Sequence, residues 1–166
     1  MVVCLCAAGL LSAAAAPAAA SVYFGATISG ESYGHPDGSH APEDVAAWNL
    51  FERHAGKKVA ILNQGHNWAV FDKAGMNATH ARGAIPMVTM GLGGGMTLAD
   101  VVNGSQDAAI RKWAQEAKAF GHPFLFVPWW EMNGNWYPWG RSPQFKEAWQ
   151  RFHGLVTAEG ATNVTW

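Results

Sequence analysis

Residues 105–127 read SQDAAIRKWAQEAKAFGHPFLFV, a stretch that predicts one helix followed by one strand. Four apolar side chains recur at the i, i+3, i+4, i+7 spacing of a single helical face: Ile110, Trp113, Ala114 and Ala117. Ser105 can cap this helix, and Gly121 and Pro123 end it. Residues 124–127 (FLFV) are apolar at every position, which is typical of a strand buried on both faces of a parallel sheet. The stretch therefore indicates an α/β fold.

The same alternation of strand and helix extends in both directions. Further strands are expected at residues 22–28, 59–62 and 85–89, and a fifth begins at 163–166. Further helices are expected at residues 42–55, weakly at 69–80, and at 142–158 after Ser142 and Pro143. Alternating units of this kind form a parallel sheet with right-handed crossovers, and both a doubly wound sheet and a (β/α)8 TIM barrel fit the pattern. Because a barrel needs about 250 residues, we expect residues 21–166 to form roughly its first half, from the first strand to the start of the fifth.

Residues 1–20 resemble a secretory signal peptide. They are apolar throughout and end in Ala18-Ala19-Ala20, a small-residue cleavage pattern before Ser21, so we expect a secreted protein. The first residues carry no Lys or Arg, which leaves a misassigned start or an Ala-rich leader as the alternative. Cys4 and Cys6 both lie in this segment, so no disulfide or thiolate metal site is expected after cleavage.

The composition excludes some partners and suggests another. A net charge of −1 argues against nucleic acid or an anionic membrane surface as a partner of the mature protein. Nine Trp residues are present, several of them next to polar loop residues. Exposed Trp can stack on sugar rings, whereas buried Trp fills a core, and composition alone does not separate the two.

Polar and aromatic residues suited to catalysis or binding follow two of the expected strands. Residues 63–68 (NQGHNW) come after the second strand and 128–140 (PWWEMNGNWYPWG) after the fourth. In parallel α/β folds such loops gather at the carboxyl ends of the strands. Glu131 is flanked by Trp129, Trp130 and Trp136, which would partly remove its carboxyl group from water and favour the protonated form that a glycosidase acid needs. The alternative is a surface glutamate that caps a loop or pairs with Arg141.

The run WEMNGNWYPWG at 130–140, followed by Ala148-Trp149 and by NVTW at 163–166, resembles glycoside hydrolase family 26. The resemblance is strong from Ile110 to Trp166 and loose before it. That family is known for β-mannanases, and some members act on mixed-linkage glucan or β-1,3-xylan. The resemblance implies a TIM barrel and a retaining endo-β-1,4-mannanase type of reaction on β-mannan or a related β-glycan, without a cofactor. It also implies that Glu131 is the general acid/base and that Trp136 and Trp139 help form the sugar-binding cleft.

Further sugar contacts are expected from Trp130 and Asn133 in the same run, and from His66 and Trp68 in the loop after the second strand. Glu31, after the first strand, is an additional substrate-contact candidate. No His spacing typical of a metal site, no phosphate-binding loop and no G-x-S-x-G motif occurs, so no metal ion or nucleotide is expected.

The sequence also departs from the family pattern. The family typically reads Arg-x-x-His-Glu, whereas Val127 and Trp130 occupy the Arg and His positions here. The family's nucleophile is a Glu after the seventh strand, so we expect it outside this chain. A non-catalytic carbohydrate-binding protein on a degenerate barrel and a gene fragment that does not fold alone are the alternatives.

Overall fold

A computed structural model of the chain describes residues 22–166, and the expected signal peptide with its two cysteines lies outside this range. The strands are β1 (Gly25–Ala26), β2 (Ile61–His66), β3 (Ile85–Met90), β4 (Phe124–Pro128) and β5 (Val164–Thr165). The helices are the 3-10 helix η1 (Glu31–Tyr33), α1 (Val45–Ala55), α2 (Lys73–Ala81), α3 (Leu98–Val102), α4 (Asp107–Phe120) and α5 (Phe145–Ala158). No helix within residues 22–166 is long and apolar enough to cross a membrane.

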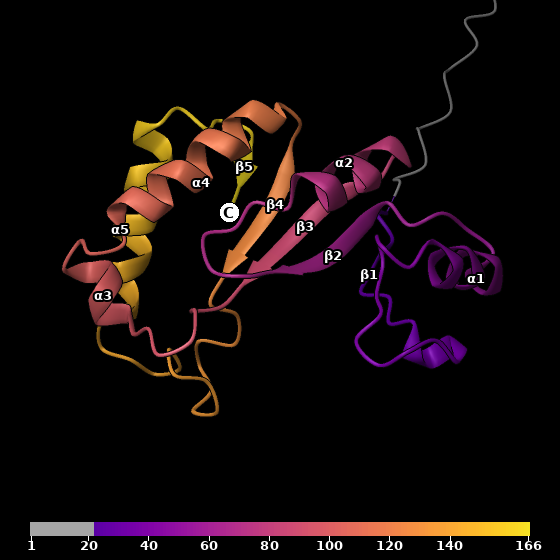
Figure 1. Cartoon of the computed structure of the whole chain (residues 1–166), viewed down its shortest axis with the longest axis horizontal. Coiled ribbons are helices and arrows are strands. Elements are labelled where there is room, and N and C mark those ends of the chain that lie inside the picture. Colours follow the sequence, from indigo (N-terminus) through magenta and orange to yellow (C-terminus); the bar gives the residue numbers. More distant parts are fainter. Residues whose placement is uncertain (1–21) are drawn as a thin grey trace, which may run out of the picture.

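The strands form one parallel sheet in the order β1-β2-β3-β4-β5 (Figure 1). Each strand therefore lies beside its neighbour in sequence, with at least one helix in every crossover. A doubly wound sheet reverses its strand order at a switch point, whereas a (β/α)8 barrel adds its strands in sequence. The observed order is that of a partial TIM barrel, as the sequence predicted.

The two faces of the sheet differ. Along β3, buried residues alternate with half-buried ones, and the buried set includes Val88 and Met90. The buried face packs against the helices. The other face carries Met87 of β3 and, in register with it, Asn63 of β2 and Leu125 of β4, all partly exposed. In a TIM barrel this second face points into the barrel interior.

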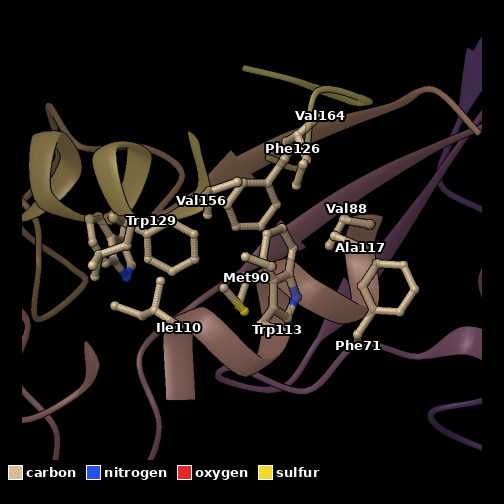
Figure 2. Close-up of a cluster of buried hydrophobic side chains, with 14 of the residues drawn as sticks. Phe71, Val88, Met90, Ile110, Trp113, Ala117, Phe126, Trp129, Val156 and Val164 are labelled. Atoms are coloured by element: carbon tan, nitrogen blue, oxygen red, sulfur yellow. The ribbon is translucent and has the colours of Figure 1, made fainter. Parts of the chain in front are cut away.

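The main core, which lies between the sheet and helices α2, α3, α4 and α5, includes the large aromatic side chains of Phe71, Trp113, Phe126 and Trp129 (Figure 2). Trp113 of α4 is fully buried and packs against Phe126 of β4, with 4.6 Å between ring centroids, and against Phe152 of α5 at 5.6 Å. A smaller cluster joins Trp48 of α1 to Leu62 of β2. Part of the Trp content is therefore structural.

Several expected boundaries shift. The first strand spans two residues, whereas β2 runs on to His66, so residues 63–66 belong to the strand and not to a loop. A short helix, α3, was not expected. It begins with a capping box between Thr97 and Asp100, and the Ser105 hydroxyl donates to the Asp100 carbonyl oxygen and does not cap α4. Helices α1, α2 and α5 begin a few residues later than predicted.

Candidate active site

The loop after β4 turns sharply between a core residue and an exposed acid. Trp129 has φ 51° and Glu131 has φ 55°, both in the left-handed region that non-glycine residues seldom adopt. The Trp129 N–H donates to the Met90 carbonyl oxygen at 2.9 Å, which extends the pairing of β3 and β4 by one residue. Trp129 is 1% exposed, whereas Glu131 faces solvent. Strained backbone of this kind is concentrated at functional sites.

The Glu131 carboxylate is held by an indole. Trp136 Nε1–H donates to Glu131 Oε2 at 2.6 Å, and the Gly134 N–H donates to the Glu131 carbonyl oxygen at 3.0 Å. The expectation that three Trp side chains desolvate this carboxyl is wrong for the described residues. Trp129 turns into the core, and Trp136 is itself 65% exposed. Arg141 does not pair with Glu131, because its side chain donates to the Asn133 carbonyl oxygen at 3.0 Å.

Trp130, Tyr137 and Trp139 form an aromatic cluster on the loop. Tyr137 stacks on Trp139 with 4.7 Å between ring centroids, and Trp130 meets the edges of both. Trp139 Nε1–H donates to the Trp130 carbonyl oxygen at 2.6 Å, and Trp139 is only 4% exposed. Trp139 therefore shapes the loop from beneath, while Trp130 stays half-exposed.

This cluster needs the glycine at the end of β3. A Cβ on Gly91 would lie 3.1 Å from Cη2 of Trp139 and 3.3 Å from Cη2 of Trp130. Both distances are closer than ordinary contacts between carbon atoms. Gly91, the first glycine of the Gly-rich run after β3, thus serves close packing of indoles.

A cavity of about 540 Å³ opens at the carboxyl ends of β2, β3 and β4. Eight residues line it: His66, Asn67, Trp68, Gly91, Leu92, Gly93, Gly94 and Trp130. Its size suits a ligand of a few sugar units or a comparable small molecule. Three predicted contact residues, His66, Trp68 and Trp130, thus share one cavity. Glu131, next in sequence to Trp130, does not line it.

His66 lines this cavity, but both of its ring nitrogens are buried. Neither of its ring nitrogens has a hydrogen-bond partner among residues 22–166. Burial lowers the pKa of His66, and the nearby Asp72 carboxylate opposes this effect.

Trp68 is fixed from two sides. Its Nε1–H donates to Gln106 Oε1 at 3.1 Å, and its ring stacks on Trp129 with 6.1 Å between centroids. Gln106, which lies just before α4, had no motif to mark it, and Tyr137 lies within the 130–140 run but was not predicted as a site residue. Trp68 is half-buried, so part of its ring remains available to the cavity.

The remaining predicted residues lie apart from the cavity. Asn133 is exposed on the loop. Glu31 lies in η1, where its Oε1 accepts the Gly38 N–H at 2.7 Å, and it is not part of the cavity lining. Glu131 is the only acidic residue of loop 129–141, and no acidic residue of the described chain lines the cavity. Neither this loop nor the cavity lining therefore supplies a second carboxylate.

Comparison with known proteins identifies the family. Residues 76–166, more than half of the chain, match the model of glycosyl hydrolase family 26. Endoglucanase H of Acetivibrio thermocellus is 32% identical over 132 residues, which are 73% of this chain and 15% of that protein. A β-mannanase from a symbiotic protist of the termite Reticulitermes speratus, solved with a gluco-manno-oligosaccharide, superposes with a TM-score of 0.60 at 16% identity, covering 87% of this chain and 56% of the mannanase chain. The chain belongs to glycosyl hydrolase family 26.

Proposed function

We propose that this chain supplies the acid/base side of the active site of an endo-acting β-glycanase, with Glu131 as the general acid/base. The observation that carries the proposal is the position of Glu131. It lies just after β4, on a strained loop, with its carboxylate oriented by Trp136 and with Trp130 reaching into the cavity next to it. A carboxyl group so placed can protonate the leaving glycosidic oxygen and then activate water.

The partner carboxylate completes a retaining mechanism. In retaining enzymes the two carboxyl groups lie about 5 Å apart, and the second forms a glycosyl-enzyme intermediate. We propose that this nucleophile lies outside the 166 residues, since the chain spans 56% of the mannanase chain that it resembles. Proton NMR of the first product anomer tests retention, because inversion would require a different arrangement of carboxylates.

β-Mannan is the proposed substrate, and β-glucan is the second candidate. The mannanase neighbour, solved with a gluco-manno-oligosaccharide, supports the first. The sequence relative named endoglucanase supports the second, at twice the identity. Release of reducing ends from mannan, glucomannan and mixed-linkage β-glucan by the full-length protein separates them.

Glu131→Gln tests the catalytic role. We expect the rate on polysaccharide to fall about 10²- to 10⁴-fold, because an amide cannot transfer the proton. For an aryl glycoside whose leaving group needs no protonation, the rate of the first step, glycosylation of the enzyme, should fall much less. This contrast is specific to an acid, since a folding defect would lower both rates alike.

Glu147→Gln is the matched control, because Glu147 is an exposed carboxylate in the first turn of α5. It should leave both rates unchanged. An unchanged polysaccharide rate in Glu131→Gln would remove Glu131 from the mechanism. Glycan binding without release of reducing ends by the unmodified protein would favour the carbohydrate-binding alternative.

We also propose that the protein is exported after cleavage before Ser21. N-terminal sequencing of protein recovered from culture medium should begin at Ser21.

A further inference from the structure

Away from Glu131, three oxygen atoms from separate segments converge beside Gly75. Glu43 Oε1, Gln64 Oε1 and Asp72 Oδ2 all lie within 3.1 Å of the point that a Cβ on Gly75 would occupy. Glu43 precedes α1, Gln64 lies in β2, and Asp72 is the N-cap of α2. Since Gly75 has no side chain, the space between the oxygen atoms stays free.

The buried amide of Gln64 points to a missing ligand. Gln64 is only 4% exposed, and its Oε1 has no hydrogen-bond partner within residues 22–166. Its Nε2 donates to Met76 Sδ at 3.0 Å, which directs the oxygen toward Glu43 and Asp72. A buried amide oxygen without a partner costs about 1–3 kcal/mol. An amide oxygen that faces two carboxylates is more unfavourable still.

The other two side chains each have one oxygen engaged elsewhere. Asp72 Oδ1 accepts the Gly75 N–H at 3.2 Å, and Glu43 Oε2 contacts His40 Nδ1 at 3.2 Å. Their second oxygens are the ones that converge. In the described part of the chain, neither carboxylate forms a salt bridge with Lys or Arg.

We propose that Glu43, Gln64 and Asp72 bind a hard divalent cation, Ca²⁺. Carboxylate and amide oxygens are the ligands that Ca²⁺ prefers, and its irregular coordination tolerates donors from three unrelated segments better than Mg²⁺ does. Within residues 22–166, no group of three or more His, Cys, Asp or Glu side chains could hold a metal ion, so the proposed site depends on the Gln64 amide as its third protein ligand.

Water completes the coordination. A cavity of about 150 Å³ adjoins Glu43 and Gly75 and is large enough for several water molecules. With three protein ligands, we expect a dissociation constant of about 10⁻⁴–10⁻³ M, the range of extracellular calcium modules. Bound Ca²⁺ would tie the start of α1 and the start of α2 to the middle of β2, next to the cavity that His66 lines.

Thermal unfolding of the chain in 10 mM CaCl₂ and in EDTA, at equal ionic strength, tests the proposal. We expect Ca²⁺ to raise Tm by about 2–6 °C, because a ligand that binds only the folded state stabilises that state. Mg²⁺ should raise Tm less. In a ¹H–¹⁵N spectrum, the Gln64 side-chain amide and the Gly75 N–H should shift with a saturable dependence on Ca²⁺.

Two conservative variants should abolish the response. Glu43→Gln removes one charge from an exposed side chain, and Asp72→Asn keeps an N-cap acceptor for α2. Glu147→Gln, an exposed carboxylate on α5, should respond like the unmodified chain.

A Tm that is independent of Ca²⁺, or a response that persists in both variants, would overturn the proposal. The first result would mean that the Gln64 amide is rotated and donates its NH₂ group to the two carboxylates. Neither readout depends on glycan hydrolysis, so the outcome is independent of the role of Glu131.

Discussion

Trp129, Trp130 and Glu131 are consecutive in sequence, yet their side chains have three different environments. Trp129 is buried in the core, Trp130 lines the cavity, and Glu131 is exposed. The motif at 130–140 was enough to select Glu131 as the candidate acid. It could not give the orientation of its neighbours, because two left-handed residues in a three-residue stretch set that orientation. The expected desolvation of Glu131 failed for this reason.

At Gly91 the close approach of two indoles makes a specific prediction. Gly91→Ala should displace Trp130 and Trp139 and lower stability by about 1–3 kcal/mol, the usual cost of overpacking. Glycan affinity of the full-length protein should fall as well, since Trp130 lines the cavity. Urea unfolding and quenching of Trp fluorescence by oligosaccharide measure the two effects.

Gly94→Ala is the control, because nothing lies within 4 Å of the added Cβ. It belongs to the same loop and the same cavity lining. Equal losses in the two variants would attribute the effect to loop flexibility and not to the indole packing.

The indole N–H of Trp136 makes a second prediction at this scale. Trp136→Phe keeps an aromatic ring but removes the donor to Glu131 Oε2. A hydrogen bond to a charged group is worth about 1.5–3 kcal/mol, so kcat should fall about 10- to 100-fold. Tm should stay within about 1 °C because the side chain is largely exposed. Steady-state kinetics of the full-length protein give kcat, and a loss confined to KM would assign Trp136 to sugar stacking alone.

Among the elements, the long amphipathic helices α4 and α5 and the apolar strands β3 and β4 were predictable from sequence. Their periodicity is strong, because each buries a full face in the core. A strand was predicted where β1 lies, but not its short extent of two residues, and the five-residue α3 was not predicted, since so few residues carry no period. The polar residues Asn63 and Gln64 gave the second half of β2 the appearance of a loop. Asn63 Nδ2–H in fact donates to Thr27 Oγ1 at 3.0 Å, across to the segment after β1.

Glu52 links α1 to the segment before β2, and its hydrogen bonds lead to a prediction about the pH dependence of stability. Burial raises its pKa, but hydrogen bonds from the Val59 N–H, from Lys58 Nζ and from Trp48 Nε1 outweigh that effect and hold the pKa below its ordinary value of 4.5. Because the folded-state pKa is the lower one, this stabilisation is present above pH 4.5 and is lost as the pH falls toward the folded-state value.

Glu52→Gln should therefore lower the free energy of unfolding by about 2–3 kcal/mol at pH 7. In the variant this free energy should also fall less steeply as the pH is lowered. Urea unfolding between pH 7 and pH 3 measures both effects. An acid dependence as steep in the variant as in the unmodified chain would show that other carboxylates cause it.

Across the whole molecule, one face of the sheet is buried and the other is open, so neighbouring residues of a strand should differ in how much their substitution lowers stability. Val88 faces the helices and is fully buried, whereas Met87, next to it, lies on the partly exposed face. In this chain Val88→Ala should cost about 2 kcal/mol of unfolding free energy, and Met87→Ala, although it removes more atoms, less than about 1 kcal/mol. Equal losses would show that the open face is covered in solution.

The stacked pair of Trp68 and Trp129 has a spectroscopic consequence. The two rings lie 6.1 Å apart with 17° between their planes, and they come from the loops after β2 and β4. Transition dipoles this close couple as an exciton, so the far-ultraviolet circular dichroism should contain a paired positive and negative band of indole origin. Other indole pairs, such as Trp130 with Trp139 at 5.0 Å, contribute bands of their own, so substitution of either Trp68 or Trp129 by Phe should remove only the contribution of this pair. Without any added dye, the amplitude of this contribution would report whether the two loops keep Trp68 stacked on Trp129.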